Sequence, residues 1–263
     1  RVRSLGLRMH DGTVKPNVRA GADSSAALYV SIMSKALTPR IAAAEAVGTC
    51  AYCCANVGAG IMAEHKLVDD GLVLLVVSLA TGVSLAVLTA MFDPISDSYF
   101  NPAQTIADAA EQRCSVGKLA ILLGLQIAGA YVGVLIAHAM FGMPLLELSA
   151  KARPQLGQIL AECVAVAGLL TVSAGTKGKL WHPFAVGGWI FAAHWFASSM
   201  SQANPALTIA RMFTTGPTGV RYQDVPQLVA GQLAGVALGL LLRRLFFRHA
   251  QTEPGGIVQP QQR

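Results

Sequence analysis

The sequence predicts an all-α integral membrane protein in which six transmembrane helices and two re-entrant half-helices form an inverted 3+3 repeat. Three observations predict this fold. Hydrophobic residues make up 53% of the 263 residues and charged residues only 13%, about half of the charged share of an ordinary soluble domain. Six long apolar segments follow one another, and an Asn-Pro-Ala tripeptide occurs twice. The composition excludes a disordered chain, a disulfide-rich secreted module and, despite the net charge of +6, a soluble nucleic-acid-binding domain.

Each of the six apolar segments is long enough to cross a bilayer, which requires about 20 mostly apolar residues. They cover residues 41–63, 71–92, 119–146, 154–175, 180–210 and 225–242. The first and fourth segments each contain one acid, Glu45 and Glu162. The fifth segment has 31 residues without Asp, Glu, Lys or Arg. Because that run is too long for one helix, we expect it to hold a spanning helix followed by a half-helix.

An internal repeat relates the two halves of the chain. Each half contains a helix with one Glu, a second helix, an Asn-Pro-Ala segment followed by Thr two positions later, and a third helix with a Gln. The paired residues are Glu45 and Glu162, Asn101 and Asn204, Pro102 and Pro205, Ala103 and Ala206, Thr105 and Thr208, and Gln126 and Gln232. Three spanning helices per half is an odd number, so the halves must be inverted in the membrane. Inverted repeats place their functional elements near the bilayer midplane.

The Asn-Pro-Ala segments are expected to begin short helices, because Asn is a good N-cap and Pro suits the first helical turn. Inversion then points both positive helix ends at one central region. The amide oxygen of each Asn can cap its helix while the NH₂ group donates to a passing water or hydroxyl. Glu45 and Glu162 are costly buried acids. We expect them to accept hydrogen bonds from the re-entrant loops, and packing against chance polar neighbours is the alternative.

On these residues the chain resembles the major intrinsic protein family, the aquaporins and aquaglyceroporins, over residues 38–248. The resemblance implies a homotetramer in the lipid bilayer, with one pore per protomer and passive flow of water or small uncharged solutes. It implies no cofactor, no metal and no nucleic-acid partner. Residues 201–211 resemble a bacterial branch linked to arsenite. The implied permeants are therefore water and glycerol-like polyols, with arsenite as a further candidate.

The resemblance also implies a selectivity filter, and here the sequence departs from the water-selective pattern. Those relatives use an aromatic residue in the second helix, a His in the fifth, and Arg directly after the second Asn-Pro-Ala. Alignment places Thr81 at the aromatic position, His194 at the His, Ser201 at a small loop residue, and Leu207 at the Arg. We therefore expect a wider ring without its usual cation. The alternative for His194 is a core histidine.

Arg211 lies one helical turn after Leu207 on the same face, which places it in the outer vestibule. It either restores a positive barrier there or anchors the outer loop through backbone carbonyls. His138 is expected at the membrane interface and His182 in solvent. The Cys-x-x-Cys pair at Cys50 and Cys53 lies inside a spanning segment, where packing is the expected role rather than redox chemistry or zinc binding.

The domain and topology predictions follow from composition and charge. Residues 1–39 are expected to be a disordered cytoplasmic extension, 40–248 an aquaporin-like channel domain, and 249–263 a disordered cytoplasmic tail. With the N-terminus inside, 15 Lys and Arg residues fall in inside segments and 5 in outside segments. The positive-inside rule then places both termini in the cytoplasm, in the cell inner (plasma) membrane. An enzyme is not expected, because no catalytic motif is present. A secondary transporter built on inverted repeats remains the alternative function.

Overall fold

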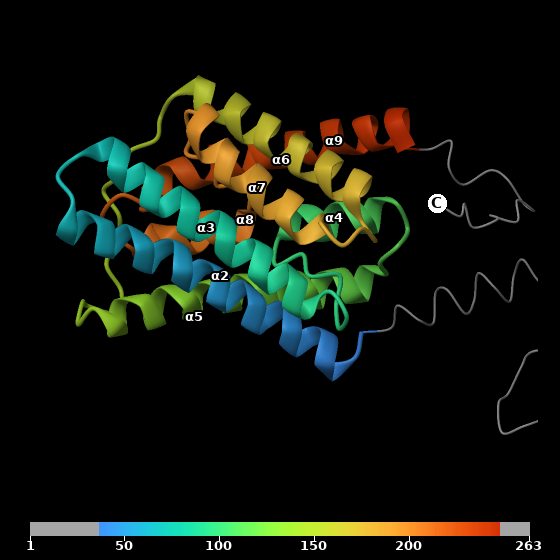
Figure 1. Ribbon diagram of the computed structural model, residues 1–263, viewed down its shortest axis with the longest axis horizontal. Helices are drawn as coiled ribbons and strands as arrows, with labels where there is room; N and C mark the ends of the chain where they lie inside the picture. Colours follow the sequence, from blue (N-terminus) through green and yellow to red (C-terminus); the bar gives the residue numbers. More distant parts are fainter. Residues whose placement is uncertain (1–36, 248–263) are drawn as a thin grey trace, which may run out of the picture. The chain divides into compact units, whose positions relative to one another are not determined.

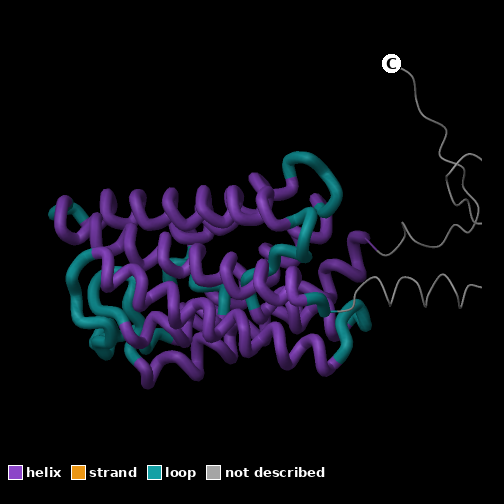
Figure 2. The backbone as a smooth tube through the Cα atoms, turned by 90° about the horizontal axis from the view of Figure 1, so that it is seen from below, coloured by secondary structure: helices purple, strands orange, loops and turns teal. Residues whose placement is uncertain are grey.

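The computed structural model describes residues 37–247. The predicted disordered extension, apart from residues 37–39, and the predicted tail lie outside the described residues. The described part contains eight α-helices and two short 3-10 turns and has no strand (Figure 1; Figure 2). These elements are α2 (Pro39–Lys66), α3 (Asp70–Phe92), α4 (Pro102–Ala110), α5 (Val116–Met140), α6 (Leu156–Thr176), α7 (His182–Phe196), α8 (Pro205–Ala210), η1 (Arg211–Phe213), η2 (Tyr222–Asp224) and α9 (Val225–Phe247). The predicted all-α fold is confirmed.

Among the described residues, five helices are long and apolar enough to span a membrane. The sixth long helix, α7, has 15 residues and a length of about 22 Å. It is short because the apolar run at 180–210 is divided between α7, a connection at 197–204, and α8. Figure 1 shows that α2 begins and α9 ends on the same side of the bundle. We call this the terminal side and the opposite one the far side.

Side-chain caps determine where several helices begin. Thr38 accepts a hydrogen bond from the Ile41 N–H at 3.2 Å, directly before Pro39 at the first position of α2. Asp69 caps α3 through the Leu72 N–H at 2.8 Å. Such caps satisfy backbone donors that the first helical turn leaves unpaired.

Glycines permit the closest helix pairs to approach backbone to backbone. A Cβ placed on Gly129 of α5 would lie 2.4 Å from the Ala46 carbonyl oxygen of α2. In the second half, a Cβ on Gly235 of α9 would lie 2.6 Å from the Cys163 carbonyl oxygen of α6. Both distances are too short for a real side chain. The pairs α2–α5 and α6–α9 are therefore equivalent contacts of the inverted repeat, packed through small residues as membrane helices commonly are.

The helices α3 and α7 cross at a second reciprocal glycine contact. A Cβ on Gly82 would lie 2.8 Å from the Gly187 carbonyl oxygen, and a Cβ on Gly187 would lie 2.3 Å from the Gly82 carbonyl oxygen. Gly82 also faces Phe191, and Gly187 faces Ala86, each four residues beyond the partner glycine. Gly82 and Gly187 are therefore equivalent positions of the two halves.

Candidate pore site

The two Asn-Pro-Ala segments begin the half-helices α4 and α8. The Asn101 Oδ1 accepts from the Ala103 N–H at 2.9 Å, and the Asn204 Oδ1 accepts from the Ala206 N–H at 3.0 Å. A proline follows each cap in the first helical turn. The unpaired N–H groups and the positive dipole end of each half-helix lie at these asparagines.

The asparagines also join the two re-entrant loops. The Asn101 Nδ2 donates to the Ala203 carbonyl at 2.7 Å, and the Asn204 Nδ2 donates to the Phe100 carbonyl at 2.8 Å. Phe100 and Ala203 directly precede the two asparagines and have φ values of +49° and +46°. This left-handed backbone is rare for residues with a side chain, and it occurs at equivalent places in both loops. Each amide group has a second hydrogen that these contacts do not use.

Two buried carboxylates hold the loops in this conformation. Glu45 is 2% exposed and Glu162 is 0% exposed. Glu45 accepts from the backbone N–H groups of Tyr99 at 3.1 Å and Phe100 at 2.9 Å. Glu162 accepts from Gln202 and Ala203, both at 2.8 Å. The backbone N–H groups thus compensate the desolvation of each carboxylate.

A glutamine links each carboxylate to the half-helix of its own half. The Gln126 Nε2 donates to Glu45 at 2.9 Å and to the Thr105 Oγ1 at 3.0 Å. The Gln232 Nε2 donates to Glu162 at 2.6 Å and to the Thr208 Oγ1 at 2.8 Å. Each of these threonine hydroxyls donates in turn to the carbonyl of its own capping Asn, at 3.1 and 2.9 Å. The repeated Thr and Gln, which the sequence showed without a role, complete the loop support.

The four proposed filter residues are all buried, at 1% exposure for Thr81, 3% for His194, 1% for Ser201 and 1% for Leu207. The Thr81 hydroxyl donates to the Val77 carbonyl at 2.6 Å, so it can offer a solute only an acceptor. The His194 Nδ1 lies 2.8 Å from the Ile190 carbonyl. Because a carbonyl only accepts, Nδ1 carries the proton and Nε2 is an acceptor. No hydrogen bond joins these four described residues to one another.

Asn56 is a further polar residue, which contacts Thr81 and was not predicted from the sequence. Its Nδ2 donates to the Thr81 Oγ1 at 2.9 Å, and it is 1% exposed. Its Oδ1 is buried and has no hydrogen-bond partner among the described residues. Asn56 therefore belongs with Thr81 as one polar pair between α2 and α3.

Arg211 is 1% exposed, and its Nε donates to the Thr218 carbonyl. This contact is of the anchoring kind that the sequence analysis considered. The two Nη groups make no hydrogen bond to any described residue. The geometry therefore allows one side chain to anchor the loop and to carry the outer positive charge.

Arg153, in the connection between α5 and α6, was counted in the sequence only as a loop charge. It is 3% exposed and joins three segments of the far side. Its guanidinium donates to the carbonyls of Ser199 at 2.9 Å, Gly219 at 3.2 Å and Pro217 at 3.3 Å. These carbonyls precede and follow α8, so Arg153 holds both ends of the second re-entrant segment. Nothing local in the sequence could reveal contacts with residues 46 to 66 positions away.

His182 was wrongly expected in solvent, and His138, which was expected at the membrane interface, is fully buried within the protein. His138 is 0% exposed, with Nδ1 donating to the Pro144 carbonyl at 2.7 Å and Nε2 lying 2.8 Å from the Thr214 Oγ1. His182 is 4% exposed and lies 2.7 Å from the Thr176 hydroxyl. Polar partners inside the protein, Pro144 and Thr214 for His138 and Thr176 for His182, bond to the rings and so permit their burial.

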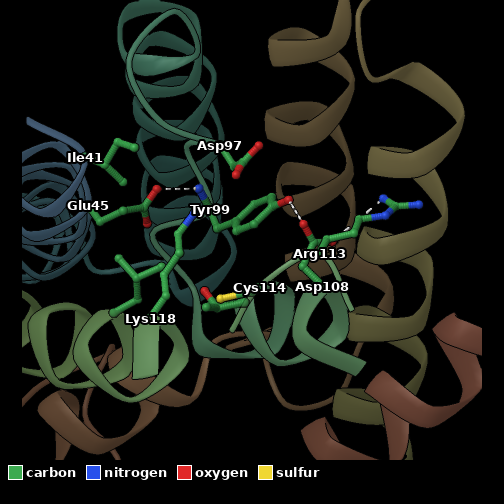
Figure 3. A pocket seen from close by; sticks show the side chains of 10 residues that line it. Ile41, Glu45, Asp97, Tyr99, Asp108, Arg113, Cys114 and Lys118 are labelled. Carbon is green, nitrogen blue, oxygen red and sulfur yellow. Dashed lines mark hydrogen bonds and ion pairs between the residues drawn. The ribbon is translucent and has the colours of Figure 1, made fainter. Parts of the chain in front are cut away.

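At the terminal side, α4 ends beside a small polar pocket (Figure 3). The Tyr99 hydroxyl donates to Asp108 there, as the dashed line in Figure 3 shows. Asp108 also pairs with Arg243 at 3.4 Å and with Arg113 at 3.9 Å. Asp108 lies seven positions after Asn101, as Arg211 lies seven positions after Asn204. The two halves therefore carry opposite charges at equivalent positions.

These features define a class: an inverted-repeat membrane protein whose two half-helices are joined end to end by reciprocal asparagines. The family model described as "MIP: Major intrinsic protein" matches residues 32–177. The chain is 40% identical over 213 residues to the aquaglyceroporin AqpS of Rhizobium meliloti (strain 1021), covering 79% of this chain and 90% of that protein. The X-ray structure of the aquaglyceroporin from Plasmodium falciparum matches with a TM-score of 0.63 at 17% identity, over 79% of this chain and 94% of that one.

The chain belongs to the major intrinsic protein family. It is a multi-pass membrane channel of the aquaporin and aquaglyceroporin type, and passive channels of this family are not enzymes. The fold resemblance to the family, first recognised from the two Asn-Pro-Ala segments, is confirmed.

Proposed function

We propose that the pore passes water and small uncharged solutes of the glycerol type, with arsenite as a further candidate permeant. The observation that carries this proposal is Leu207, buried at the position where water-selective relatives have Arg. A leucine there offers no fixed cation and no donors. Together with Thr81 in place of an aromatic ring, it supports a filter that is wider and less charged than a water-selective one.

The proposed path runs through the reciprocal asparagines. Asn101 and Asn204 each keep one amide hydrogen for a passing oxygen, and both half-helices direct positive ends toward the same place. A neutral hydroxylated solute is favoured there, and a cation is repelled. This is the selectivity by donors and half-helix dipoles that is described for aquaporins in general.

The buried acids favour a channel over a secondary transporter. A transporter of this architecture needs groups that bind a coupling ion. Glu45 accepts from four groups, two of them backbone N–H groups. Glu162 accepts from three. Acceptors engaged in holding loops are poor carriers for protons or sodium.

The test is stopped-flow light scattering on proteoliposomes with water, glycerol, urea and arsenite, each measured alone. A channel predicts glycerol flux that rises linearly with concentration and does not depend on a proton or sodium gradient. Saturable flux that follows either gradient would support the transporter. Absence of glycerol flux in well-folded protein would contradict the proposed solute class.

Assembly and orientation are part of the same proposal. We infer a homotetramer in the inner membrane with both termini in the cytoplasm, which agrees with the family resemblance and with the excess of Lys and Arg in the segments assigned to that side. The molar mass of the purified protein, corrected for detergent, tests the oligomer. Labelling of single cysteines introduced at exposed Leu180 and Leu148 by a membrane-impermeant reagent tests the orientation.

A further inference from the structure

Because the two halves are inverted, residues of the proposed filter on the far side have structural counterparts on the terminal side. In the loops, Ser201 lies three residues before Asn204, and Ser98 lies three residues before Asn101. Both serines have left-handed backbone, with φ of +38° and +52°. The Ser201 N–H donates to the Ser199 hydroxyl at 3.2 Å, and the Ser98 N–H donates to the Ser96 hydroxyl at 3.0 Å. Ser98 is therefore the structural counterpart of Ser201.

The helices supply a second counterpart. Because Gly82 and Gly187 are equivalent, His194, seven residues after Gly187, corresponds to Thr89, seven residues after Gly82. At 1.5 Å per residue, each lies about 10 Å from the α3–α7 crossing. The two helices run in opposite directions, so His194 lies toward the far side and Thr89 toward the terminal side. Thr89 and Ser98 are the mirror positions of His194 and Ser201.

Both mirror residues present unused hydroxyls. Thr89 is 2% exposed and Ser98 is 4% exposed, and neither hydroxyl has a hydrogen-bond partner among the described residues. A buried hydroxyl that forms no hydrogen bond is unfavourable, and most such groups in proteins find a partner. A pair of them at equivalent positions therefore points to a ligand.

The unpaired hydroxyl of Thr89 is unusual among the threonines of the described helices. In the described α-helices, every other threonine donates its hydroxyl proton to the carbonyl four residues earlier. These threonines are Thr49, Thr81, Thr105, Thr171, Thr176 and Thr208. The Thr89 hydroxyl does not make this bond. It therefore remains available to another group.

We propose that Thr89 and Ser98 form a second solute-binding station in the pore, between the asparagines and the terminal-side mouth, for neutral polyhydroxylated solutes. The proposal rests on the proposed function. Each hydroxyl can donate one hydrogen bond and accept others, which matches the hydroxyl groups of a polyol. On this side the counterpart of Arg211 is Asp108, whose charge is paired with Arg243. Thr89 and Ser98 themselves carry no charge, so they bind a solute through hydrogen bonds.

The test removes the two hydroxyls with little change of shape, in Thr89→Val, Ser98→Ala and the double variant. Losing a hydrogen bond of ordinary strength corresponds to about a 3-fold to 10-fold effect. We expect each single variant to lower glycerol permeability about 3-fold and the double variant about 10-fold, with a smaller loss for water. Thr89→Ser, which keeps the hydroxyl, should behave as wild type. Thr171→Val is the matched control, because it removes a helical hydroxyl that is already bonded to the Ala167 carbonyl.

The possible results distinguish a failure of the proposed binding station from a failure of the proposed function. Wild-type protein without glycerol flux overturns both. If the wild type conducts glycerol and the double variant has the same glycerol permeability, the station alone is overturned. The station is also overturned if Thr171→Val loses as much glycerol permeability as the double variant. If the double variant does not assemble, Thr89→Cys replaces it. The station predicts that mercuric ion blocks Thr89→Cys faster than wild type or Thr171→Cys and that glycerol slows the block. Equal rates in all three would overturn it.

Discussion

Replacing Glu162 by Gln tests whether a buried carboxylate holds the second re-entrant loop. One carboxylate oxygen accepts from the Gln202 N–H at 2.8 Å, and the other accepts from the Ala203 N–H at 2.8 Å and from Gln232 at 2.6 Å. A glutamine keeps one acceptor oxygen and places an NH₂ group against a donor. The substitution therefore loses one charge-assisted hydrogen bond, at about 1.5–3 kcal/mol, and reduces two others to neutral strength, at about 1 kcal/mol each. We expect a loss of roughly 4 kcal/mol of stability.

The assay is thermal unfolding in detergent together with glycerol flux in proteoliposomes. For a chain of this length, 1 kcal/mol corresponds to roughly 2–4 °C, so Glu162→Gln should lower the melting temperature by about 10 °C and reduce the flux. Glu147→Gln is the matched control, because Glu147 is exposed and its carboxylate accepts one hydrogen bond, from Thr215 at 3.4 Å. It should shift the midpoint by no more than about 2 °C. If Glu162→Gln melts as the control does and conducts normally, the loop does not depend on the carboxylate.

Three further substitutions test single side chains of the proposed pore. Asn204→Asp places an anion where two positive helix ends meet, so glycerol flux should fall about 10-fold or a cation current should arise in planar bilayers. Leu207→Arg adds a bulky group with five donors. Stopped-flow traces should show glycerol and arsenite permeability reduced by roughly 10-fold, with water permeability largely kept. Thr81→Phe adds a rigid ring and removes the acceptor of Asn56. It should raise the ratio of water to glycerol permeability several-fold.

Each of these predictions has its own contrary result. If Asn204→Asp shows unchanged solute flux and no ion current, Asn204 has no central role in permeation. Leu207 does not face the pore if glycerol and arsenite pass Leu207→Arg at wild-type rates. A constant permeability ratio in Thr81→Phe would remove Thr81 from the filter. Because Thr81 lies within α3, expression level and oligomer size must match wild type before any of these results is interpreted.

The helical architecture was predictable because its signals are local in the chain. Uncharged runs of bilayer length indicate spanning helices, and an Asn-Pro pair indicates a helix start wherever it occurs. The inverted arrangement followed from counting three helices in each half. The structure confirms this architecture, including the division of the long run at 180–210 into α7 and α8.

The hydrogen bonds from the loops to Glu45 and Glu162 were predicted and are confirmed. The other contacts of the loops could not be predicted, because they join residues that are distant in the chain. The Asn101 amide binds a carbonyl 102 positions away, and its Asn204 counterpart binds one 104 positions away. Arg153 and His138 are buried by segments that meet them only in the folded protein. From sequence alone, a polar residue in a connection is indistinguishable from a solvated one until the covering segment is known.

The difference between the halves supports the proposal that the pore lacks the usual filter arginine and still opposes cations. Asp108 accepts from the Tyr99 hydroxyl and pairs with Arg243 and Arg113, so its negative charge is compensated. Its counterpart Arg211 has a carbonyl as its partner and makes no ion pair with the described residues. With two positive half-helix ends between them, the fixed charge along the proposed path is positive. In the proposed filter, width and charge, which water-selective relatives combine in one arginine, are assigned to the separate positions 207 and 211, so a wider ring does not require the loss of the cation barrier.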